Sequence, residues 1–143
     1  MAEQVAFDDI VADFDFLEDW DDRYKYLIDL GRQLVHFPEQ SRIEANKVRG
    51  CASQVWLTHK EKGNGADATL HFQGDSDAHI VKGLVAVLLA LYSGKTRGEI
   101  LALDERAALK PLDLDGHITP QRSNGLASMI KRIKETATEE AAQ

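Results

Sequence analysis

Residues 53–92 read SQVWLTHKEKGNGADATLHFQGDSDAHIVKGLVAVLLALY, and this stretch decides the fold class. Segments 53–58 and 68–72 are short and rich in β-branched and aromatic residues, which is typical of strands. Between them, the sequence KGNG at 62–65 is a turn signal. Apolar residues then cover almost every face of a run at 78–92, which is typical of a core helix. The stretch therefore predicts a strand hairpin followed by a buried helix.

On the N-terminal side of this stretch, apolar residues recur at helical spacing in two runs. They predict helices at about 8–18 and 20–35. Phe37-Pro38 ends the second helix, because proline disfavours helical geometry in the residue before it. Val48, followed by a tight turn at Gly50-Cys51, is expected to supply the third antiparallel strand of the sheet.

Capping signals place the helices that follow. Ser76-Asp77 is expected to cap the core helix. Thr96 with Glu99 forms a capping-box pattern that opens a short helix. Segment 104–109 is expected to add another, and Thr119-Pro120 is an N-cap followed by proline at the first position of the last helix.

The order helices, strands, helices predicts an α+β fold in which a three-stranded antiparallel sheet packs against helices. The 143 residues fit one domain, 1–143, and show neither an internal repeat nor a linker. Residues 1–6 and 136–143 lie outside the apolar periodicity and are expected to fray.

Composition excludes several classes of function. The net charge of −7 disfavours nucleic acid and anionic membrane surfaces as partners, because both require clustered Lys and Arg. The start of the chain lacks the pattern of a signal peptide, and the longest apolar run, 83–92, is shorter than the roughly 20 residues of a membrane span. A single cysteine forms no disulfide within the chain, which favours a reducing compartment and predicts a cytoplasmic protein.

Cys51 lies in the sequence KVRGCASQVW at 47–56. Gly50 permits a positive φ or a close approach of another segment. Lys47 and Arg49 are expected to favour the reactive thiolate over the thiol. The alternative is that Cys51 is a small buried apolar residue, as lone cysteines often are.

Other chemistry finds little support in the sequence. The five histidines show no paired ligand spacing, and one cysteine cannot build a thiolate metal site, so no metal is expected. No phosphate-binding glycine loop occurs. A cysteine–histidine catalytic pair stays open, because such partners are rarely adjacent in sequence.

Four blocks of sequence resemble the SufE family of sulfur-acceptor proteins. The first is Val-x-Gly-Cys-x-Ser-Gln-Val-Trp-Leu at 48–57, and the others lie at 75–84, 98–100 and 114–126. The last block contains Arg-x-Asn-Gly-Leu, and the first and last blocks together are specific. The resemblance covers about residues 7–134.

The resemblance implies an α+β domain similar to the scaffold proteins of cluster assembly. It implies a covalent sulfur carrier, not an enzyme with turnover of its own. Cys51 would accept persulfide sulfur from a cysteine desulfurase, stimulate that enzyme and deliver the sulfur for iron–sulfur cluster assembly. The carrier needs no cofactor, since pyridoxal phosphate belongs to the desulfurase. Matched positions near the loop or the partner interface are Gly50, Ser53, Gln54, Asp75 and Arg122.

The partners implied are a desulfurase of the SufS or CsdA type and a cluster scaffold or another sulfur acceptor, with the chain as a monomer or homodimer. A resting loop is expected to shelter the sulfur against Val55, Trp56 and the helix at 78–92. Two alternatives to the sulfur carrier remain. One is a noncovalent adaptor that activates a desulfurase allosterically, and the other is a redox sensor oxidised at Cys51.

Overall fold

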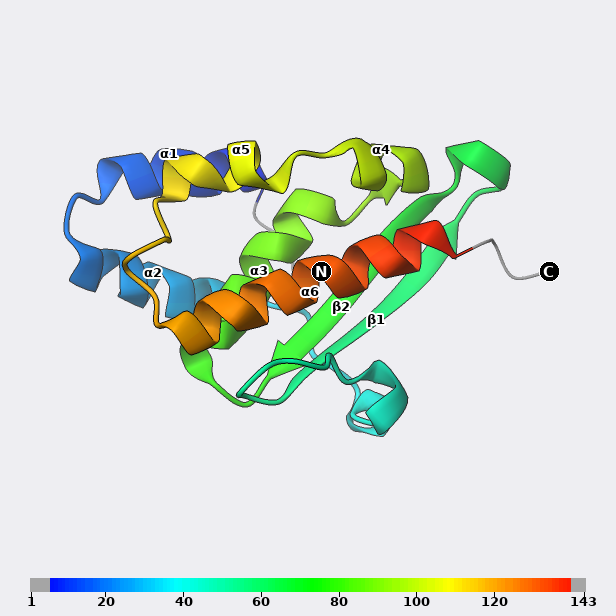
Figure 1. The fold of residues 1–143 in the computed structure, drawn as a ribbon, viewed down its shortest axis with the longest axis horizontal. Coiled ribbons are helices and arrows are strands. Elements are labelled where there is room, and N and C mark those ends of the chain that lie inside the picture. The colour runs from blue at the N-terminus through cyan, green and yellow to red at the C-terminus, as the bar shows by residue number, and fades with distance from the viewer. Residues whose placement is uncertain (1–5, 140–143) are drawn as a thin grey trace.

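Helices pack along one side of a small antiparallel sheet in the computed structural model, which describes residues 6–139 (Figure 1). The helices and strands are α1 (Phe7–Phe16), α2 (Trp20–Arg32), β1 (Val55–Lys62), β2 (Thr69–Ser76), α3 (His79–Tyr92), β3 (Lys95–Thr96), α4 (Arg97–Ala102), α5 (Glu105–Leu109) and α6 (Pro120–Thr138). Four short 3-10 turns lie between them: η1 (Glu39–Ser41), η2 (Glu44–Asn46), η3 (Gly65–Asp67) and η4 (Lys110–Leu112). The predicted α+β class is confirmed.

The sheet has the order β1-β2-β3, and both pairings are antiparallel. β1 and β2 pair along their full length, from Val55 opposite Ser76 to Lys62 opposite Thr69. The turn between them contains Gly63 and Gly65 at φ of +91° and +64°, a left-handed conformation that glycine adopts without strain. The predicted hairpin and its glycine turn are therefore confirmed.

The third strand is not where the sequence placed it. Residue 48 belongs to no strand; the chain there makes one isolated bridge, between Lys47 and Trp56, and one hydrogen bond from Val48 N to Val55 O of 2.8 Å. The η2 turn before this bridge and the left-handed Gly50 after it bend the chain away, so pairing cannot continue. The third strand is instead β3, which pairs with the start of β2.

The core forms where α3 packs between the sheet and α2. Leu84, Val85 and Leu88 of α3 are buried, as the apolar run predicted. On the sheet side, Val85 lies so close to Gly74 of β2 that a Cβ on Gly74 would stand 2.7 Å from it. On the α2 side the backbones nearly touch, because a Cβ on Gly83 would stand 2.2 Å from the carbonyl oxygen of Leu27. α6 lies beside α3 and α4 and closes the core.

Two of the three predicted caps form. Thr96 makes the full capping box, and the Thr119 side chain accepts a hydrogen bond from the backbone of α6. The cap predicted for α3 is wrong: its N-cap residue is Ala78, without a side-chain cap. Asp77 instead accepts a hydrogen bond from the Gln54 backbone at 3.1 Å, so its carboxylate serves the Cys51 loop and not the helix.

The C-terminal helix is longer than expected. α6 runs to Thr138, and both Thr136 and Ala137 are buried, so fraying from residue 136 is wrong for 136–138. The other ends expected to fray, 1–5 and 140–143, lie outside the described residues. Within residues 6–139, no helix is long and apolar enough to cross a membrane.

Candidate functional site

Cys51 lies in the loop between Lys47, which forms a bridge with Trp56, and the start of β1. Gly50 before it has a φ of +88°, and a Cβ on Gly50 would stand 2.6 Å from the Ser128 hydroxyl of α6. This left-handed backbone favours glycine, and a larger residue would also require the Ser128 hydroxyl to turn away. The Cys51 Sγ lies 3.7 Å from the carbonyl oxygen of Gly125, one turn earlier on α6. The loop therefore holds the thiol against α6.

A hollow of about 160 Å³ opens beside the thiol. It lies between the loop, α3 and the first turns of α6. Its lining residues are Cys51, Ala52, Ser53, Val81, Thr119, Gln121, Arg122 and Gly125. The helix at 78–92 thus provides cover through Val81, as expected, but Val55 and Trp56 are not among the lining residues. The half-buried thiol faces a space that is larger than one water, whose share of liquid volume is about 30 Å³.

Burial raises the pKa of the Cys51 thiol above its ordinary value. The expectation that Lys47 and Arg49 lower this pKa is wrong, because burial of the thiol raises it. The Arg49 side chain points away from Cys51 and pairs with Glu44 at 3.4 Å. At neutral pH Cys51 in this structure is therefore mainly the thiol, and greater exposure of the side chain would favour the reactive thiolate.

Gly125 lies against the thiol, and its replacement with alanine tests whether it sets how deeply the thiol is covered. A Cβ on Gly125 would stand 3.6 Å from the Cys51 Sγ, an ordinary van der Waals contact. We expect Gly125→Ala to stabilise α6 by about 0.5–1 kcal/mol, because alanine is the better helix residue. We also expect slower alkylation of Cys51 by iodoacetamide and a pH midpoint shifted upward. Both proteins should react equally fast in urea; faster reaction of the folded variant would contradict this interpretation.

Gln54 and Asp77 hold the far end of the loop. The Gln54 backbone N–H donates to the Asp77 carboxylate, and the Asp77 N–H donates to the Gln54 carbonyl at 3.3 Å. Ser53, the residue before Gln54, lines the hollow. These paired bonds fix the loop to the segment between β2 and α3.

Asp75 lies apart from the hollow, on β2. It is only 5% exposed, and its carboxylate pairs with the guanidinium of Arg42 and with Lys82 Nζ at 3.2 Å. Burial alone would raise the pKa of Asp75, but hydrogen bonds from Arg42, the Ser76 backbone and Lys82 outweigh it and lower the pKa. The Arg42 guanidinium also lies over the Trp56 ring, 5.8 Å from its centroid. Asp75 thus fixes the segment that leads into the loop and does not face the thiol.

The structure brings Cys51, Ser53 and Arg122 to one hollow, with Gly50 and Gln54 on either side in the loop. Five of the lining residues were not expected at the site from the sequence: Ala52, Val81, Thr119, Gln121 and Gly125. Gly125 could have been found from the sequence, because a glycine inside a helix is unfavourable unless another segment approaches it closely. Within residues 6–139, no group of three or more His, Cys, Asp and Glu side chains is arranged to hold a metal ion.

A family model described as SufE, the Fe-S metabolism associated domain, matches residues 8–137. The chain belongs to the SufE family. A SufE domain that spans nearly the whole chain supports a role in iron–sulfur metabolism.

Individual SufE-like proteins agree with this assignment. An uncharacterized SufE-like protein of Rhizobium meliloti is 51% identical over 132 residues, which are 92% of this chain and 94% of that protein. Another, of Rhizobium etli, is 51% identical over 137 residues, 96% of this chain and 93% of that protein. The solution structure of a hypothetical protein from Thermus thermophilus has the same fold, with a TM-score of 0.66 at 19% identity over 92% of both chains.

Proposed function

We propose that this SufE-family protein is a covalent sulfur carrier whose Cys51 accepts sulfur from the persulfide of a pyridoxal-phosphate cysteine desulfurase. It stimulates the desulfurase by removing this sulfur and delivers it, in the cytoplasm, to a scaffold on which iron–sulfur clusters are built. The desulfurase supplies the cofactor and the chemistry on cysteine. The carrier has no turnover of its own.

The observation that carries the proposal is the position of Cys51. It is the chain's only cysteine, it sits half-buried in a loop, and it borders a hollow with room for one more sulfur atom. A cysteine that only filled the core would need no adjacent space, because protein interiors are close-packed. A persulfide at this position gains shelter from other thiols when the loop rests on α6.

The transfer step balances without an external oxidant or reductant. Cys51 loses its proton, and the thiolate attacks the outer sulfur of the donor persulfide. An S–S bond forms between the Cys51 Sγ and this sulfur while the S–S bond of the donor breaks. The donor cysteine leaves as a thiolate and takes up a proton. The transferred sulfur keeps its oxidation level.

Because the pKa of Cys51 is raised, the partner has to expose the thiol before sulfur can be transferred. In the resting loop, burial disfavours the thiolate, so the attack is slow until the loop leaves the hollow. Docking of the desulfurase has to offset the free energy of uncovering the thiol. A loop that opens only when a partner docks also keeps the loaded sulfur away from other thiols. The same loop movement therefore controls both the uptake and the delivery of sulfur.

Intact mass of the protein after incubation with a cysteine desulfurase and cysteine tests the proposal. We expect a gain of one sulfur atom, removed by a thiol reductant, and faster turnover of the desulfurase. Faster turnover without the gain would indicate the noncovalent adaptor. A gain of oxygen on treatment with peroxide, with no sulfur loading from any desulfurase tried, would indicate the redox sensor.

A further inference from the structure

One side of α6 supports the whole segment that leads to Cys51. Gly125, Ser128 and Arg132 are three and four residues apart, so they lie on the same side of the helix. Cys51 lies on Gly125 and Gly50 lies on Ser128. Two turns beyond Gly125, Arg132 binds the beginning of the segment.

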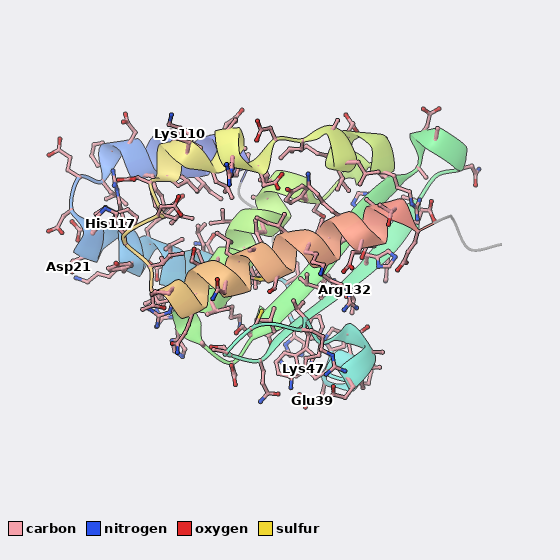
Figure 2. All side chains as sticks on the ribbon, in the orientation of Figure 1. Asp21, Glu39, Lys47, Lys110, His117 and Arg132 are labelled. Carbon is pink, nitrogen blue, oxygen red and sulfur yellow. The ribbon has the colours of Figure 1, made fainter. Side chains whose placement is uncertain are left out.

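The Arg132 guanidinium makes two hydrogen bonds to backbone carbonyls. Its Nη1 donates to Lys47 O at 3.2 Å, and its Nη2 donates to Ala45 O at 2.8 Å. Figure 2 shows Arg132 on the side of α6 that faces the segment carrying Lys47. The guanidinium is planar and its donors are fixed relative to one another, so the two bonds define the path of the chain as well as holding it.

The backbone bonds at the base of the loop limit how far Cys51 can move. Val48 N donates to Val55 O, and Gln54 is bonded to Asp77, so residues 49–53 are the part that can detach. Cys51 is three residues from Val48, and an extended chain of that length spans about 10 Å. This reach also requires that the chain before Val48 stays fixed. The Lys47–Trp56 bridge and the buried Val48 side chain hold it from the sheet side, and the Arg132 side chain binds it from α6.

We propose that Arg132 is the positioning residue of the Cys51 loop. By holding the carbonyls of Ala45 and Lys47, it fixes the point from which residues 49–53 swing out and keeps the resting thiol covered on α6. The consequence for sulfur uptake rests on the carrier function proposed above. The effect on the resting thiol does not depend on that function, and it is therefore the first readout.

The test is iodoacetamide alkylation of free Arg132→Met across a pH series, with Lys131→Met as the matched control. Lys131 is exposed on the same helix, and its replacement makes the same charge change. We expect Arg132→Met to react about tenfold faster at neutral pH, which corresponds to about 1.4 kcal/mol. The pH midpoint of Cys51 should fall towards its ordinary value, because a less covered thiol loses the burial that raises its pKa.

Arg132→Lys separates positioning from a general loss of stability. Lysine keeps the charge, but its single ammonium group cannot reproduce the two fixed donors of the guanidinium. We therefore expect a rate of alkylation between that of the wild type and that of Arg132→Met. If Arg132→Met does not fold, Arg132→Lys decides the question alone. Wild-type alkylation and an unchanged pH midpoint in the folded variants would overturn the proposal, as would an equal change in Lys131→Met.

With a desulfurase present, the same variants show whether the anchor matters for uptake. We expect Arg132→Met to raise the KM for the carrier more than it changes kcat, because a loop without a fixed base presents Cys51 in more positions. If the wild type takes up no sulfur while the alkylation results hold, the carrier function has failed and the positioning role stands.

Discussion

Cys51→Ser is expected to abolish sulfur uptake completely while leaving the fold intact. The chain has no other cysteine, so the variant has no atom on which a persulfide can form. Folding should be nearly unaffected because serine has the same shape, and its hydroxyl can donate to the Gly125 carbonyl that lies 3.7 Å from the thiol in the native chain. We expect the free energy of unfolding to change by no more than about 1 kcal/mol.

Two measurements on this variant separate the possible roles of Cys51. Intact mass after incubation with a desulfurase and cysteine should show no added sulfur, and urea unfolding should show a near-native midpoint. Stimulation of the desulfurase should also disappear, since stimulation here means removal of the enzyme's persulfide. If the variant still stimulated the enzyme as well as the native chain does, the protein would act by contact and the carrier proposal would be wrong. A variant that failed to fold would make Cys51 a structural residue.

How well the sequence predicted the fold depends on how local each signal is. The helices at 8–18 and 20–35 were found within a few residues because burial of one side sets their apolar spacing. The helix at 78–92 was found because apolar residues cover almost every face of it. Both signals lie within the segment itself. The hairpin was found because Gly63 and Gly65 occupy positive-φ positions that few other residues adopt.

Features that depend on distant contacts were missed. β3 has only two residues, and nothing in Lys95-Thr96 indicates a strand until its partner β2 is in place. The expected strand at Val48 failed for the reverse reason: its apolar side chain is buried, but the backbone pairs at one point only. Asp77 looked like a helix cap, yet a carboxylate accepts a hydrogen bond from any nearby N–H, and in the folded chain the Gln54 N–H donates it.

In the candidate site, too, some residues could be predicted from the sequence and others depend on distant contacts. The resemblance to SufE proteins located Cys51 together with Ser53 and Arg122, which share the hollow. The positive charges near Cys51 in sequence predicted a lowered pKa, but side-chain direction decides this effect, and Arg49 points to Glu44. Arg132 is 81 residues from Cys51, and its side chain bonds to backbone carbonyls, so no local pattern connects the two.

Gly83→Ala is expected to be among the most destabilising single changes in the chain. The new Cβ would stand 2.2 Å from the carbonyl oxygen of Leu27 and 2.6 Å from its carbonyl carbon. Both atoms belong to the backbone of α2, so no side-chain rotation relieves the clash, and α2 and α3 have to move apart. Overpacked cores lose about 1–3 kcal/mol and occasionally more; because the clash is with backbone, we expect about 3 kcal/mol here.

Gly98→Ala is the matched control, because it also replaces a helical glycine but has no neighbouring atom within 4 Å of the new Cβ. We expect this variant to be as stable as the native chain or more stable by up to about 1 kcal/mol. Thermal unfolding should therefore separate the two variants by roughly 10 °C, since 1 kcal/mol shifts the Tm of a domain of this size by about 3–4 °C. If Gly83→Ala unfolded together with Gly98→Ala, the close contact of α2 and α3 would not exist in solution. The packing that fixes α3, and with it the wall of the hollow formed by Val81, would then need a different description.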